Sequence, residues 1–152
     1  MNKFALFKLN EFCAANSIEY AVTGTTALSL LGVPTNLVPQ GIDIKVPCLT
    51  EEQAKKLKEL QLLSGLEDEK YGDDRCFSFT VCGIKINVLC DYTNGNSGNQ
   101  TVSISLIDEE HKKHHIIKVQ LVKHALTDKM KLNRPKDKTY LIDLIKNLAS
   151  LV

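Results

Sequence analysis

The stretch that decides the fold is YAVTGTTALSLLGVPTNLVPQGIDIKV, which runs from Tyr20 to Val46. A β-type run ends at Gly24, and a short apolar helix and a loop bounded by two prolines follow it. A second β-type run then carries a single acid, Asp43. Side chains two residues apart on a strand share a face, so Gly41 and Lys45 flank this acid on its own face. The pattern predicts half of a binding site, made by a glycine turn and an acidic strand.

The glycine turn consists of Gly24, Thr25 and Thr26. Backbone N–H groups at the start of a helix have no partner within that helix, and they lie at the positive end of its dipole. The three residues therefore predict an anion site suited to phosphate. A structural alternative stays open, in which the glycine ends a strand, Thr25 or Thr26 lies near the N-cap of the helix, and nothing binds.

The rest of the chain alternates between helical and strand patterns. Apolar spacing predicts helices at residues 3–15, 50–60, 121–133 and 136–152, and β-rich runs predict strands at residues 75–81, 84–92, 101–107 and 114–120. Thr50 and Gln53 predict a capping box, and Cys82-Gly83 predicts a hairpin turn. Residues 64–74 and 93–100 are polar and are expected to form loops. The mixture predicts an α/β or α+β fold, a single domain over residues 1–152 with helices flanking a mixed sheet.

Charge and composition exclude several classes of protein. The chain has 19 basic and 18 acidic residues, which leaves a net charge of +1. This balance gives no long-range attraction to nucleic acid or to a membrane, so any site for a polyanion has to be local. No apolar run approaches the roughly 20 residues that span a bilayer, and no membrane is expected as a partner.

The five cysteines are odd in number and contain no C-x-x-C pair. We expect reduced thiols in a cytoplasmic protein rather than a disulfide framework. Cys82 and Cys90 lie in apolar runs, where cysteine behaves as a small buried hydrophobe.

A histidine-rich run, HKKHH, occupies residues 111–115. Histidines spaced as H-x-x-H can bind zinc, but the two lysines between them indicate an exposed turn that enters a strand. The run has no interleaved aromatic residues, so it gives no strong nucleic-acid signal.

Four segments together resemble one family: VTGTTALSLLGVP, GIDIKV, IKINVL and LTDKMKLNRPKDKTYLIDLI. They resemble the DNA polymerase β-like nucleotidyltransferase superfamily, and most closely its small prokaryotic branch, which includes toxin enzymes of the abortive-infection type. The resemblance covers most of the chain, and its most specific piece is the run Arg134-Pro135-Lys136-Asp137 that follows Lys129. It implies a minimal nucleotidyltransferase fold in which Lys129 and Lys136 contact nucleotide phosphates. The alternative is a solvated basic helix end, and Asp137 is expected to cap the last helix.

The departures from the family pattern concern its three metal-binding acids. The family has two acids on one strand and a third on a later strand. Here the first position is Gly41, the second is Asp43 and the third is Asn87. Two-metal phosphoryl transfer uses carboxylates to hold both ions, and magnesium prefers anionic oxygen ligands. One carboxylate supplies too little negative charge for that mechanism.

Other acids lie near these positions in the sequence, although nothing in their spacing aims them at the site. They are Asp73, Asp74 and Asp91.

The sequence therefore predicts a protein with a nucleotidyltransferase fold and degenerate catalytic acids. It would bind a nucleoside triphosphate or a protein partner in the Gly24/Asp43 groove, with no cofactor. One alternative is an active enzyme that moves a nucleoside monophosphate from a triphosphate to an RNA or protein hydroxyl. In that case Mg²⁺ would be held by Asp43 as the catalytic residue. The nucleotide contacts in either case would be Gly24, Thr25, Thr26, Asn87, Lys129 and Lys136.

A second alternative is a protein-interaction domain unrelated to nucleotides. It predicts that Gly24, Asp43 and Asn87 lie on separate faces of the molecule rather than around one groove.

Overall fold

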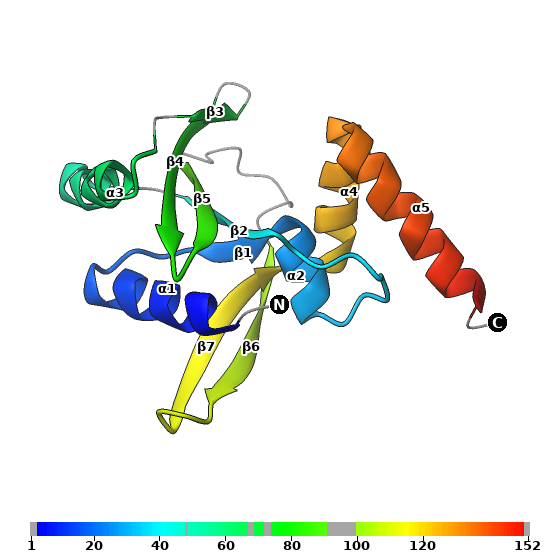
Figure 1. The fold of residues 1–152 in the computed structure, drawn as a ribbon, viewed down its shortest axis with the longest axis horizontal. Coiled ribbons are helices and arrows are strands. Elements are labelled where there is room, and N and C mark those ends of the chain that lie inside the picture. The colour runs from blue at the N-terminus through cyan, green and yellow to red at the C-terminus, as the bar shows by residue number, and fades with distance from the viewer. Residues whose placement is uncertain (1–2, 48, 67–68, 72–73, 91–99, 151–152) are drawn as a thin grey trace.

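The structure, a computed structural model, describes residues 3–47, 49–66, 69–71, 74–90 and 100–150. Its helices are α1 (Lys3–Ala15), α2 (Gly24–Leu30), α3 (Glu51–Leu63), α4 (Val122–Leu132) and α5 (Pro135–Ser150). Its strands are β1 (Ala21–Thr23), β2 (Gly41–Val46), β3 (Glu69–Tyr71), β4 (Asp74–Val81), β5 (Ile84–Cys90), β6 (Thr101–Asp108) and β7 (Lys113–Gln120). Figure 1 shows α1 and α3 on one side of the molecule and α4 and α5 on the other.

The described strands form one seven-stranded sheet with the order β3-β4-β5-β2-β1-β7-β6. β2 runs parallel to β5 and β1 runs parallel to β7, whereas the other neighbours are antiparallel. This arrangement confirms the predicted mixed sheet with flanking helices.

The two faces of the sheet differ in polarity because side chains alternate along each strand. On β2, Ile42, Ile44 and Val46 are buried in the main core, which also contains apolar residues of α1 and α3. Gly41, Asp43 and Lys45 alternate with them and so point to the opposite face. A second, smaller core joins α2, α4 and α5, and it consists of Leu28, Ala125, Tyr140 and Leu144. The polar face of β2 therefore lies toward the helices of the second core.

Helix α3 begins with the signal that the sequence predicted. The Thr50 hydroxyl accepts a hydrogen bond from the Gln53 backbone N–H, and the Gln53 side chain accepts one from the Thr50 N–H. This confirms the predicted capping box. The same helix covers one edge of β4, because the buried Gln61 side chain accepts a hydrogen bond from the Ser78 N–H and Ser64 accepts one from the Thr80 N–H.

The β4–β5 hairpin turns at Cys82 and Gly83, as predicted. Both residues have positive φ, 51° and 78°, which is the backbone geometry of the tight two-residue turn that matches the twist of a hairpin. Cys82 is exposed at this turn, so the expectation that it is buried is wrong, whereas Cys90 is buried as expected. The two expectations for Cys82, a turn position and a buried side chain, conflict with each other, and the turn position is the one that the structure confirms.

Two further expectations need correction. Residues 64–74 are not simply a loop, because Glu69–Tyr71 forms β3 and β4 begins at Asp74. Helix α2 begins at Gly24 with Thr23 at its N-cap, so Thr25 and Thr26 lie inside its first turn. The predicted loop at residues 93–100 lies, except for Gln100, outside the described residues. Within the run HKKHH, His111 and Lys112 lie in an exposed turn that leads into β7, as predicted, but His115 is buried in the strand.

Candidate functional site

A pocket of about 1100 Å³ opens on the polar side of β2. Its walls come from the β1–α2 turn, β2, β5, α4 and the start of α5. All seven residues that the sequence predicted for the site line this pocket: Gly24, Thr25, Thr26, Asp43, Asn87, Lys129 and Lys136. The arrangement in which Gly24, Asp43 and Asn87 lie on separate faces is therefore not the one observed.

Strand register brings the acidic position and the turn together. Asp43 lies opposite Thr23 on one side and opposite Asn87 on the other. The Asn87 Nδ2 donates a hydrogen bond of 2.9 Å to Oδ1 of Asp43. The Ser78 hydroxyl in turn donates one of 2.8 Å to Oδ1 of Asn87. Because a carboxylate only accepts hydrogen bonds, this chain fixes which side of the Asn87 amide faces Asp43.

Gly24 makes the sharp entry into α2. Its φ is +64°, and a Cβ at this position would lie 3.6 Å from Oδ2 of Asp43. Space would suffice for a methyl group, but the backbone conformation is one that L side chains rarely adopt. Thr26, two residues later, is buried, and its hydroxyl donates to the Gly41 carbonyl at 2.8 Å. Its hydroxyl thus joins α2 to β2, and its predicted contact with nucleotide stays a prediction.

The position of the first family acid is closed by backbone packing. A Cβ on Gly41 would lie 2.8 Å from the Lys85 carbonyl oxygen of β5. Backbone atoms cannot yield to this overlap as a flexible side chain would. An aspartate at position 41 therefore requires β2 and β5 to move apart.

The residues present do not fit a pair of magnesium ions. Asp43 is the only one of the three family positions with a carboxylate, and the Asn87 amide directs N–H rather than oxygen at it. Among the described residues, no group of three or more His, Cys, Asp or Glu side chains lies together as a metal site would. Of the acids considered as replacements, Asp73 and Asp91 lie outside the described residues and the Asp74 side chain is not described.

Lys129 is the central cation of the site and is only 7% exposed. Its Nζ donates a hydrogen bond of 2.7 Å to Oγ1 of Thr25, lies 3.7 Å from Oδ1 of Asp137, and sits 4.4 Å from the centre of the Tyr140 ring. Burial lowers the pKa of this ammonium, and Asp137 offsets part of that effect. The alternative of a solvated helix end does not describe Lys129, although Lys136 is exposed at the pocket rim.

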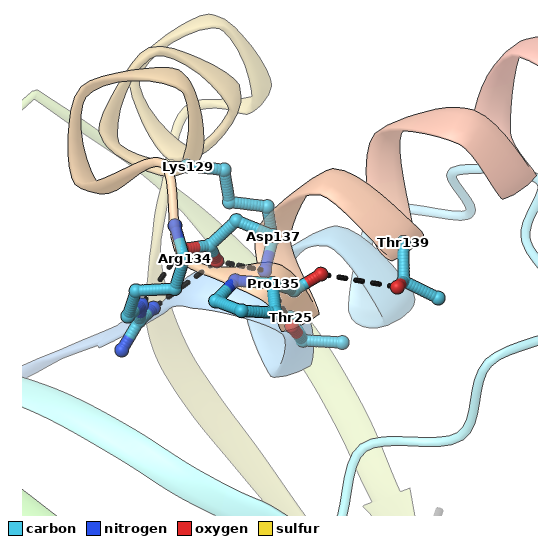
Figure 2. A network of polar contacts seen from close by, with 6 residues as sticks. All are labelled: Thr25, Lys129, Arg134, Pro135, Asp137 and Thr139. Atoms are coloured by element: carbon cyan, nitrogen blue, oxygen red, sulfur yellow. Dashed lines mark hydrogen bonds and ion pairs between the residues drawn. The ribbon is translucent and has the colours of Figure 1, made fainter.

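Asp137 contacts two cations of the pocket, Arg134 and Lys129, as Figure 2 shows. It is fully buried. Its carboxylate accepts hydrogen bonds from Nε of Arg134 at 2.7 Å, from Nη2 at 3.1 Å and from the Arg134 backbone N–H at 3.1 Å. The backbone bond is the helix-capping role predicted for Asp137. The two hydrogen bonds from the guanidinium also fix the orientation of the Arg134 side chain, which the sequence did not reveal.

A second acid-backed cation lies further along β2. Nζ of the buried Lys45 lies 3.2 Å from Oδ2 of Asp128, which also accepts a hydrogen bond from the Gln120 side chain. Sequence analysis placed Lys45 on the Asp43 face but assigned it no role. Its partner on α4 lies 83 residues away, a distance at which spacing gives no signal.

The pocket is strongly basic in an almost neutral chain. Among the described residues, two acids line it, Asp43 and Asp128, against six basic residues. The basic set is Lys45, Lys85, Lys129, Lys131, Arg134 and Lys136. The near-neutral net charge predicts that any site for a polyanion has to be local, and the pocket is a local concentration of basic side chains. Lys85 and Lys131 were missed because strand and helix faces alone do not show which cations converge.

Comparison with known proteins bears on the fold. No family model matches the sequence, and no curated protein matches it. Solved structures do match. A "putative nucleotidyltransferase" from Thermotoga maritima has a TM-score of 0.55 and 19% identity over 93% of this chain and 90% of its own. An antigenic nucleotidyltransferase-like protein from Paracoccidioides brasiliensis has a TM-score of 0.57 and 14% identity over 94% of this chain and 73% of its own.

These likenesses establish the class to which the fold belongs: the chain has a nucleotidyltransferase fold. At such low identity they do not carry over activity or substrate. Within the described residues, no helix combines the length and the apolar character needed to cross a membrane.

Proposed function

We propose that this protein binds the phosphate chain of a nucleotide in the basic pocket without performing two-metal nucleotidyl transfer. The observation that carries the proposal is the convergence of six basic residues and two hydrogen-bonded carboxylates on a single pocket of about 1100 Å³. A pocket of that size accommodates a nucleotide. Clefts lined by charges of one sign concentrate ligands of the opposite sign.

Lys129 supplies the main phosphate contact in this proposal. An ammonium group has three N–H donors, and the hydrogen bond to Thr25 uses one of them. Because the side chain is held at the junction of α2, α4 and α5, its charge is already in place when the ligand arrives, and little conformational entropy is lost on binding.

Calorimetric titration with ATP, GTP, CTP and UTP tests the proposal, with Lys129→Met and Lys136→Gln as pocket variants. Lys138→Met is the matched control, since Lys138 is exposed on α5 and does not line the pocket. We expect saturable binding to the wild type and to the control, and about tenfold to a hundredfold weaker binding to each pocket variant, since a charged hydrogen bond contributes about 1.5–3 kcal/mol. Lys136 is exposed, so its variant remains informative if Lys129→Met does not fold.

An absence of nucleotide binding by the folded wild type overturns the proposal. It would favour the remaining hypothesis, in which the groove is a surface for a protein partner. Transfer of label from a nucleotide to an acceptor would instead show an active enzyme and would contradict the loss of two-metal chemistry.

A further inference from the structure

Positions 41, 43 and 87, where the resembled family has acids, and the cations around them favour a phosphate ligand that carries no metal. We propose that the pocket binds the phosphate chain as a metal-free anion. Lysine and arginine N–H groups would neutralise the phosphate charge, as Mg²⁺ does in two-metal enzymes. This inference rests on the proposed function and narrows it to nucleoside triphosphates or inorganic triphosphate not bound to a divalent cation.

The first support is that the metal positions are closed in two different ways. At position 41 the Lys85 carbonyl leaves no room for a side chain. At position 87 the amide N–H donates a hydrogen bond to Oδ1 of Asp43. The amide oxygen is also engaged, by the Ser78 hydroxyl. Magnesium requires near-ideal oxygen ligands around it, and here Oδ1 of Asp43 and Oδ1 of Asn87 each already accept a hydrogen bond.

The second support is that the cations of the pocket are held in place by acids. Asp137 fixes the Arg134 guanidinium with two hydrogen bonds and lies beside Lys129. Asp128 forms an ion pair with Lys45. Guanidinium and ammonium groups with fixed geometry are the usual protein ligands of phosphate. A pocket of this kind attracts a free triphosphate more strongly than its magnesium complex, because the metal removes two units of negative charge from the ligand.

The test is calorimetric titration of the wild type with inorganic triphosphate and with ATP at one fixed ionic strength, once in EDTA and once in excess Mg²⁺. We expect binding in EDTA, and a dissociation constant about threefold to tenfold higher in Mg²⁺ from the reduced ligand charge. Titration with Mn²⁺ alone is expected to give no saturable binding at Asp43.

Binding that requires Mg²⁺, or that becomes tighter with it, overturns the inference and leaves the proposed function standing. Saturable Mn²⁺ binding that is lost in Asp43→Ala overturns it as well. An absence of binding in both buffers overturns the inference together with the proposed function.

The Asn87→Asp variant gives a second arm, since it replaces the amide with a carboxylate at the same position. We expect the ratio of the two dissociation constants, Mg²⁺ over EDTA, to fall in this variant. An unchanged ratio would contradict a role for the Asn87 amide in excluding the metal.

Discussion

Asn87 on β5 donates a hydrogen bond of 2.9 Å to Asp43 on β2, across a parallel strand pair in which the two residues are in register. A carboxylate at position 87 would place two negative charges at this distance, and such a pair is stable only with a proton or a cation between them. The amide removes that requirement. Oδ1 of Asp43 and Oδ1 of Asn87 thus each accept a hydrogen bond from a neighbouring side chain, with no charge repulsion between the two positions.

The first prediction concerns this pair directly. Asn87→Asp should lower the free energy of unfolding by about 2–4 kcal/mol in EDTA at neutral pH, because a charged hydrogen bond is replaced by repulsion. Urea denaturation followed by circular dichroism measures the change. Asn87→Ser, which removes the amide without adding charge, is the comparison and should lose less. Equal losses in the two variants would show that repulsion at this site is negligible.

The second prediction concerns the glycine beside it. Gly41→Ala should cost about 1–3 kcal/mol, since the added carbon overlaps a backbone oxygen of β5 and strands must separate to admit it. Gln40→Ala, a substitution of the exposed neighbouring residue, is the control and should be nearly neutral. Chemical denaturation measures the free energy of unfolding of both variants. If Gly41→Ala is as stable as the wild type, the strands are more compliant at this point than the structure indicates.

Much of this architecture could be predicted from local sequence signals. The capping box of Thr50 and Gln53 and the turn at Cys82-Gly83 depend on interactions between residues a few positions apart, so their patterns are visible in the chain. The positions of Gly24, Asp43 and Asn87 around one pocket were predicted from a family resemblance, and strand register accounts for it. The nucleotide contacts themselves remain predictions.

What could not be predicted depends on contacts between distant segments. The pairing of Lys45 with Asp128 requires knowing which side of α4 faces β2. The closure of position 41 depends on how closely β5 approaches, which no single strand encodes. The N-cap of helix α2 was expected near Thr25 or Thr26, because threonine is a good capping residue. The observed N-cap is Thr23, and the helix begins at Gly24, whose φ is positive.

The third prediction concerns the acid behind the cations and its pH dependence. Burial raises the pKa of the Asp137 carboxyl, but its hydrogen bonds with Arg134 outweigh this effect and bring the pKa below its ordinary value. A carboxyl of this kind contributes stability that is fully present above its unfolded-state pKa and is lost as the pH falls through its folded-state pKa. Wild-type stability should therefore fall as the pH drops below about 4.

Asp137→Asn tests whether the Asp137 carboxyl causes this loss of stability at low pH. It should lower the free energy of unfolding by roughly 3 kcal/mol at neutral pH, because two cations lose their buried partner. It should also flatten the decline of stability between neutral and acidic pH. Asp108→Asn is the comparison, since hydrogen bonds from His111 outweigh burial and lower the pKa of that carboxyl too, far from the pocket. A pH profile of Asp137→Asn that runs parallel to the wild type would contradict the assignment.

The last prediction concerns the edge of the sheet at β4. The Gln61 side chain, buried on α3, accepts a hydrogen bond from the Ser78 backbone N–H, and Ser78 in turn holds Asn87. Gln61→Leu has a similar size but no acceptor, so the Ser78 N–H is left buried without this partner. The expected cost is about 1–3 kcal/mol of unfolding free energy, and faster hydrogen exchange at Ser78 is expected with it. Glu59→Ala, an exposed substitution on the same helix, should change neither quantity. Unaltered exchange at Ser78 in Gln61→Leu would show that α3 shields this edge by packing rather than by its hydrogen bond.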